Sequence, residues 1–213
     1  MKGLFFMLKN INISKNALEW GLIFGFICSV FCSFADFDAS CEDLRHNVLR
    51  LHIVANSNSE KDQTLKLEIR DRILEESQSL FETEKDLDSA IATAKENLKT
   101  YEKIANEVIN KAGLDYKAEA KIGKAFFETR VYEDFTLPSG EYDSLIINLG
   151  DANGKNWWCV VFPSVCLPTE NKASLDISVG ERGCEIAQNG EWFIAKFKTL
   201  DIYEKIKKAI RGS

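Results

Sequence analysis

Three arrangements in the chain contain residue types that could carry out catalysis, and each is incomplete. A nucleophilic thiol needs a base beside it, and His52 with Cys159 or Cys166 is the available combination, but no nucleophile signature surrounds either cysteine. The segment Gly150–Asn156 (GDANGKN) is similar to a phosphate-binding loop, yet it has one residue too few between its glycines and no Ser or Thr after Lys155. Carboxylates are numerous, and sequence alone does not select a catalytic pair. The sequence therefore predicts a protein that is not an enzyme and has no cofactor.

Metal binding is not expected either, because the chain has no C-x-x-C motif and its two histidines, His46 and His52, are too far apart for a helical zinc pair. Four cysteines lie outside the apolar N-terminal segment, and an even number in an exported chain suggests disulfides. Cys159–Cys166 would close a small loop and Cys41–Cys184 would then link distant segments. The alternative, that some of them stay as buried thiols, is open.

The N-terminal segment has the features of an export signal. Three lysines precede Trp20–Ala35, sixteen residues without a charge that end in Ser33–Phe34–Ala35. A basic start, an apolar stretch and a small–x–small ending are typical of a secretory signal peptide, with cleavage before Asp36. An uncleaved membrane anchor is the alternative. Sixteen residues are slightly fewer than the about 20 that span a bilayer, but a segment rich in Phe and Trp can still be held in it. Both interpretations place the rest of the chain outside the cytoplasm.

The remainder has the size of one ordinary domain. The chain has 213 residues and a net charge of −6, and residues 36–213 hold 24 basic against 32 acidic side chains. This acidic balance lacks the basic patch that nucleic-acid binding requires. We expect residues 1–35 to be a signal peptide or membrane anchor and residues 36–213 to be a single extracytoplasmic domain.

The first half of this domain predicts one strand and two helices. Val48–Ala55 alternates apolar and polar residues, which is typical of a half-buried strand. The turn Asn56–Ser59 follows, and Ser59 with Asp62 forms a loose capping box for a helix that runs to about residue 81. A second helix is predicted over residues 86–112, with Gly113 as its C-terminal cap.

The second half predicts mainly strands. The segments with this pattern are Tyr116–Tyr132, Tyr142–Leu149, Trp157–Phe162 and a short one at Trp192–Phe197. Residues 150–154 have the composition of a hairpin turn between two of them, and residues 200–210 read as a terminal helix. The predicted fold class is α+β: one mainly antiparallel sheet, made of the N-terminal strand and a C-terminal meander, with two long helices packed on one face.

Two adjacent tryptophans draw attention as binding residues. Neighbouring residues on a strand face opposite ways, so one of Trp157 and Trp158 points into the core and the other points out. Large aromatic side chains dominate binding hot spots. The outward tryptophan is therefore a candidate interface anchor, unless the C-terminal segment covers it.

Two stretches carry a resemblance to a known family. Leu49–Asp71 (LRLHIVANSNSEKDQTLKLEIRD) and Leu137–Cys166 (LPSGEYDSLIINLGDANGKNWWCVVFPSVC) closely resemble the stage II sporulation protein R family of endospore-forming bacteria. The resemblance implies a signalling protein that the forespore secretes into the space between the forespore and mother-cell membranes. There it would activate a membrane-embedded aspartic protease of the mother cell, which processes the precursor of sigma factor E. An exported hydrolase acting on cell-wall material is the alternative function.

The resemblance also indicates where partner contacts are to be sought. The candidate positions are His52, Asn56, Asp62, Gln63, Lys66, Arg70, Gly154, Asn156, Trp157 and Trp158. Some of them are expected to hold the junction of strand, turn and helix instead of touching a partner.

Overall fold

The computed structural model describes residues 15–132, 135–163 and 181–211. The chain divides into two compact units, Met1–Ala39 and Ser40–Ser213. Helix α2 (Lys15–Arg45) begins in the first unit and ends in the second. Among the described residues it is the one helix long and apolar enough to cross a membrane, a property that signal sequences near an N-terminus share. The predicted cleavage position before Asp36 lies inside this helix, and cleavage stays a prediction.

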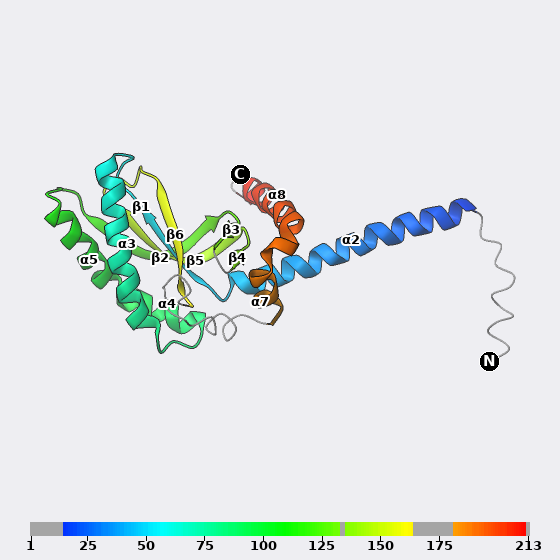
Figure 1. Ribbon diagram of the computed structural model, residues 1–213, viewed down its shortest axis with the longest axis horizontal. Coiled ribbons are helices and arrows are strands. Elements are labelled where there is room, and N and C mark those ends of the chain that lie inside the picture. The colour runs from blue at the N-terminus through cyan, green and yellow to red at the C-terminus, as the bar shows by residue number, and fades with distance from the viewer. Residues whose placement is uncertain (1–14, 133–134, 164–180, 212–213) are drawn as a thin grey trace. The chain divides into compact units, whose positions relative to one another are not determined.

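The second unit is built on a four-stranded sheet (Figure 1). Its strands lie in the order β2 (Ala118–Phe127), β5 (Gly140–Leu149), β1 (Leu49–Val54) and β6 (Asn156–Phe162). β2 pairs antiparallel with β5, β1 pairs antiparallel with β6, and the central β1 and β5 are parallel. The α+β class and the mainly antiparallel sheet are confirmed.

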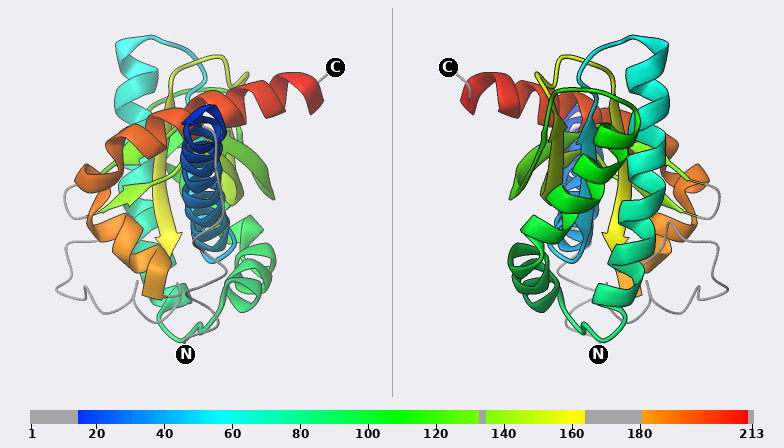
Figure 2. Two further views of the ribbon diagram at one scale, coloured as in Figure 1. Left: turned by 90° about the vertical axis from the view of Figure 1, so that its right-hand side faces the viewer. Right: turned by 90° about the vertical axis from the view of Figure 1, so that its left-hand side faces the viewer.

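Three helices cover one face of this sheet, as both views in Figure 2 agree. They are α3 (Glu60–Phe81), α4 (Leu87–Glu96) and α5 (Leu98–Lys111). Leu51 and Ile53 of β1 point into this layer and meet Ile69 and Ile73 of α3, and all four are fully buried. Burying each such side chain contributes about 1.5–3 kcal/mol, so this layer forms the core of the unit.

Local hydrogen bonds explain where these helices begin and end. The Ser59 side chain accepts a hydrogen bond from the Asp62 N–H and caps α3, as predicted. The predicted second helix is interrupted at Asn97, whose side chain donates to the Thr93 carbonyl and ends α4. Asn competes for backbone hydrogen bonds in this way. Gly113, with φ of +67°, ends α5 as predicted.

The remaining elements lie on the other side of the sheet (Figures 1 and 2). They are the two-stranded pair β3 (Arg130–Val131) and β4 (Thr136–Leu137), the helix α7 (Glu181–Gln188), the 3-10 helix η2 (Gly190–Phe193) and α8 (Ile194–Arg211). The predicted strand at residues 192–197 is therefore wrong, because this segment continues into the terminal helix.

The predicted hairpin between β5 and β6 is also wrong. β1 lies between these two strands and pairs with both. Every residue of β1 except His52 is buried, and a strand buried on both faces belongs in the centre of a sheet. Residues 150–155 consequently form a crossing connection at the end of the sheet, where they meet the turn that follows β1.

Candidate functional site

The turn after β1 and the connection after β5 lie side by side, because parallel strands end at the same edge of a sheet. The Gly154 N–H donates to the Ala55 carbonyl at 2.8 Å, and the Asn153 N–H donates to the Asn56 carbonyl at 3.1 Å. Two segments almost a hundred residues apart in the chain are thus joined through their backbones.

Asp62 organises the side chains at this edge. Its carboxylate accepts hydrogen bonds from the Ser57 hydroxyl at 2.6 Å, the Tyr116 hydroxyl at 2.7 Å and the Asn56 amide at 3.1 Å. Burial alone would raise the pKa of Asp62, but these hydrogen bonds to the ionised form outweigh it and lower the pKa below its ordinary value. Asp62 is therefore a fixed structural anion that several donors surround.

Lys66 extends the same arrangement along α3. Its ammonium group donates to the Gln63 side-chain oxygen at 2.7 Å and to the Lys155 carbonyl at 3.0 Å. The Gln63 amide in turn donates to the Ser57 carbonyl at 2.8 Å. Burial lowers the pKa of Lys66, and the charges of Lys155 and Arg70 act in the same direction. We call this connected set the loop network; its residues are Asn56, Ser57, Asp62, Gln63, Lys66 and Tyr116.

Two glycines let the segments approach this closely. A Cβ atom at Gly154 would collide with the Ser57 carbonyl. A Cβ atom at Gly150, whose φ is +55°, would collide with the Asn56 side chain, and a positive φ itself favours glycine. The Asn56 side-chain oxygen instead accepts a hydrogen bond from the Asp151 N–H at 2.9 Å.

The network holds an exposed edge in place. Asn58, Asp151, Asn153 and Lys155 are all exposed. The Asn58 side-chain oxygen accepts a hydrogen bond from the Lys155 N–H at 2.9 Å, which links the two segments again. We call these four residues the rim. With amide groups and one charge of each sign, the rim can recognise a polar partner surface.

The two tryptophans lie on opposite faces of the sheet, as predicted, and both are half-buried. Trp157 packs against the core under the helices, with the Arg70 guanidinium 5.1 Å from its ring centroid. Trp158 is on the other face, where its ring centroid is 6.3 Å from that of His52 and 6.1 Å from that of Phe127.

A residue that the sequence reading did not select, Arg50, dominates this other face. Its guanidinium carbon lies 3.9 Å from the ring centroid of Phe127 and 4.9 Å from that of Tyr142, and one of its nitrogens donates to the Tyr132 hydroxyl at 2.9 Å. The side chain is fully buried. The alternation in residues 48–55 gave no signal of this burial, because it is typical of a half-buried strand, whereas β1 is central and covered on both faces.

We call this second group the aromatic cluster; its residues are Arg50, His52, Phe127, Tyr142 and Trp158. Burial lowers the pKa of His52, the Asn156 side chain acts to raise it, and the charge of Arg50 acts to lower it further. Within the described ranges, neither imidazole nitrogen has a hydrogen-bond partner of good geometry. His52 is thus held as a neutral side chain among aromatic rings.

The ten candidate positions therefore separate into groups. Five meet at the joined segments: Asn56, Asp62, Gln63, Lys66 and Gly154. Arg70 and Trp157 lie beside them under the helices, His52 and Trp158 belong to the aromatic cluster, and Asn156 is exposed where β6 begins, paired with Val54. Contact of any of them with a partner stays a prediction.

The structure separates His52 from Cys159. Trp158 pairs with His52, whereas Cys159 pairs with the adjacent Leu51, so the cysteine lies on the face that the helices cover. Within the part of the chain that the structure describes, no group of three or more His, Cys, Asp or Glu side chains could hold a metal ion.

The cysteine predictions stay largely untested by the described residues. Cys41 is buried, but the side chain of its predicted partner Cys184 is not described, so the Cys41–Cys184 link stays a prediction. Cys159 is disulfide-bonded. Cys166 and the side chain of Cys184 lie outside the described residues, so the Cys159–Cys166 pairing stays a prediction.

Known proteins are similar to the part of the chain that forms the loop network and the aromatic cluster. A family model described as stage II sporulation protein R matches residues 45–172. The Stage II sporulation protein R of Bacillus subtilis (strain 168) is 35% identical over 133 residues, which are 62% of this chain and 56% of that protein. No solved structure matches the chain. Because the family model spans more than half of the chain and includes the whole loop network, the chain belongs to the stage II sporulation protein R family.

Proposed function

We propose that this sporulation protein is an exported signal that activates a membrane-embedded aspartic protease of the mother cell by binding to it. The activated protease then processes the precursor of sigma factor E. Family membership supports the sporulation role, and the sequence resemblance supplies the protease and its substrate.

The proposed place of action is the space between the forespore and mother-cell membranes. The apolar stretch of α2 near the N-terminus is compatible with a signal peptide or an anchor. Either one would carry residues 36–213 across the forespore membrane, so that this part could meet a receptor embedded in the opposite membrane.

The observation that carries the proposal is the way the loop network supports the rim. Hydrogen bonds between buried and half-buried groups fix both segments, while Asn58, Asp151, Asn153 and Lys155 are exposed to solvent. A surface that is ordered before binding loses less entropy on association. The rim is therefore the part of the molecule that we expect the protease to contact.

Co-expression tests the function directly. The full-length chain would be produced with the receptor protease and the sigma-factor precursor in a non-sporulating host that exports it, and precursor cleavage would be followed on immunoblots. We expect cleavage with the chain and active protease together, and none when a catalytic aspartate of the protease is replaced by asparagine. Cleavage that persists with the inactive protease would show that the chain has its own activity and would contradict the proposal.

A further inference from the structure

Helix α8 has apolar residues on two opposite faces. Phe197 and Leu200 are buried against the rest of the unit. Ile202, Ile206 and Ile210 follow one another at intervals of four residues, which places them on one face of the helix. Their side chains are 62%, 55% and 73% exposed, so this outer face lies open to solvent.

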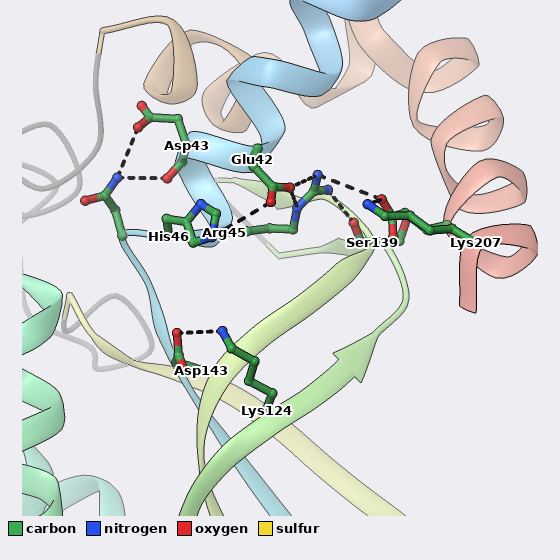
Figure 3. A network of polar contacts seen from close by, with 10 residues as sticks. Glu42, Asp43, Arg45, His46, Lys124, Ser139, Asp143 and Lys207 are labelled. Carbon is green, nitrogen blue, oxygen red and sulfur yellow. Dashed lines mark hydrogen bonds and ion pairs between the residues drawn. The ribbon is translucent and has the colours of Figure 1, made fainter. Parts of the chain in front are cut away.

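The inner side of α8 is attached by polar contacts as well as by apolar ones. Arg45 at the end of α2 lies 4.0 Å from Glu204, which also pairs with Lys207 at 3.1 Å. Figure 3 shows Arg45 and Lys207 of this group close together, with the Ser139 carbonyl also accepting from Arg45. Each of these contacts uses the inner side of α8, so none of them requires the three outer isoleucines.

Two further contacts fix the rotation of α8 about its axis. The Thr129 hydroxyl donates to the Asp201 carboxylate at 2.6 Å, and Lys205 pairs with Glu128 at 3.0 Å. With the inner face held in this way, the isoleucines cannot turn inward without breaking ion pairs and hydrogen bonds. The isoleucines are therefore exposed because these contacts fix the orientation of the helix.

The charge of α8 differs from that of the rest of the unit. The helix carries six basic and two acidic residues, although residues 36–213 as a whole are acidic. Successive residues of a helix are about 100° apart, so Lys198 and Lys205 lie along one side of the stripe, next to Ile202 and Ile206. Lys207, at its other border, pairs inward with Glu204. An apolar stripe beside a row of lysines is typical of helices that lie in the surface of an anionic membrane.

An exposed tryptophan precedes this stripe. Trp192 in η2 is 80% exposed, the largest value among the exposed large apolar side chains of the described residues. Tryptophan is enriched at the boundary between lipid headgroups and acyl chains. Its exposure and its place in the chain directly before α8 make it a further residue that could contact lipid.

We propose that the outer face of α8 binds the surface of a membrane that contains anionic phospholipid. Ile202, Ile206 and Ile210 would lie at the level of the upper acyl chains, and the exposed Lys198 beside them would contact lipid phosphates. A lysine beside the stripe favours a lipid surface over a protein groove, because a groove would desolvate it beside apolar walls. This inference does not depend on the identity of the receptor.

Hydrogen–deuterium exchange of the full-length chain, reconstituted in vesicles, tests the inference. One set of vesicles contains phosphatidylcholine only, and the other contains phosphatidylcholine and phosphatidylglycerol in a 7:3 ratio. We expect exchange in peptides from α8 to be about five-fold slower in the anionic vesicles, since docking suppresses local opening. The variant Ile202→Gln/Ile206→Gln/Ile210→Gln should lose this difference, and Lys198→Glu should reduce it.

Peptides from β5 report in every sample whether the unit is folded, and Val131→Gln is the matched control because Val131 is exposed on another element. Equal exchange of α8 in the two kinds of vesicle would overturn the proposal. So would slow exchange that the glutamine variant retains. Slowing that occurs only after the extracytoplasmic part of a receptor protein is added would show that this face binds protein, and would also overturn it.

Discussion

The loop network and the aromatic cluster both contain residues selected by the family resemblance, but they differ in whether their buried polar atoms have hydrogen-bond partners. In the loop network the buried carboxylate of Asp62 accepts three side-chain hydrogen bonds. In the aromatic cluster, two guanidinium nitrogens of Arg50 and both imidazole nitrogens of His52 are buried without a hydrogen bond. These are four of the five such side-chain atoms in the described part of the chain.

The difference predicts that the two regions contribute unequally to stability. A satisfied polar network specifies one geometry and is costly to break, whereas replacing buried charged groups by apolar side chains of similar volume is often neutral for stability. The network should therefore be needed for the fold, and Arg50 should not be.

The largest expected effect is at the centre of the network. Asp62→Ala should lower the free energy of unfolding by about 3 kcal/mol, because it removes a buried acceptor and leaves the half-buried Ser57, Tyr116 and Asn56 donors without it. Urea unfolding measures this change. Glu60→Ala, in the exposed first turn of the same helix, is the control and should cost less than about 1 kcal/mol. Equal effects of the two changes would contradict the role assigned to the network.

The contact between the two loops gives the next largest effect. Gly154→Ala should cost about 2 kcal/mol, because the new methyl group meets the Ser57 carbonyl and forces the segments apart. Gly123→Ala is a matched control, since a Cβ there meets only the Ile146 side chain, at an ordinary 3.5 Å. Thermal unfolding of both variants makes the comparison. A neutral Gly154→Ala would show that the loops are not in close contact.

A substitution in the aromatic cluster should change stability only slightly. Arg50→Met should alter the free energy of unfolding by less than about 1 kcal/mol, because methionine fills similar space without buried N–H groups. Chemical denaturation of the variant measures this. A loss as large as that of Asp62→Ala would mean that Arg50 has polar partners beyond the Tyr132 hydroxyl, and would remove the contrast between the two regions.

The smallest effect concerns pH. Because the folded state lowers the pKa of His52 below 6.5, His52 contributes stability that is fully present above that value and is lost as pH falls toward its folded pKa. His52→Gln should therefore reduce the loss of thermal stability between about pH 7.5 and about pH 5. His46→Gln is the control, since the His46 side chain is 62% exposed. Identical pH profiles of wild type and His52→Gln would refute this origin.

Features that depend on residues close together in the chain were predicted correctly, and features that depend on distant residues were not. The Ser59 cap and the Gly113 helix end depend on neighbours within a few residues, and both are confirmed. The position of β1 between β5 and β6 depends on pairing with partners about a hundred residues away in the chain, which local alternation does not report. Residues 150–154 have the composition of a hairpin turn, and taking them as one made β5 and β6 neighbours, which they are not.

The candidate site shows the same limit. The family pattern selected most of the loop network, but Tyr116 and Ser57 complete it through contacts that spacing does not reveal. Arg50 was missed because an arginine in an alternating strand looks solvent-exposed until both faces of the sheet are covered. The sequence resemblance therefore identified most of the candidate residues. Only the fold showed which of them support the rim and which belong to the core.

The central claim, that the rim carries the signal, is tested most directly by exchanging its two charges. Asp151→Lys/Lys155→Glu changes only exposed side chains, so it should leave the melting temperature unchanged. With receptor protease and precursor present, we predict that this variant no longer triggers precursor cleavage, while the control Lys103→Glu, exposed on α5, triggers it normally. A folded rim variant that supports normal cleavage would contradict the account.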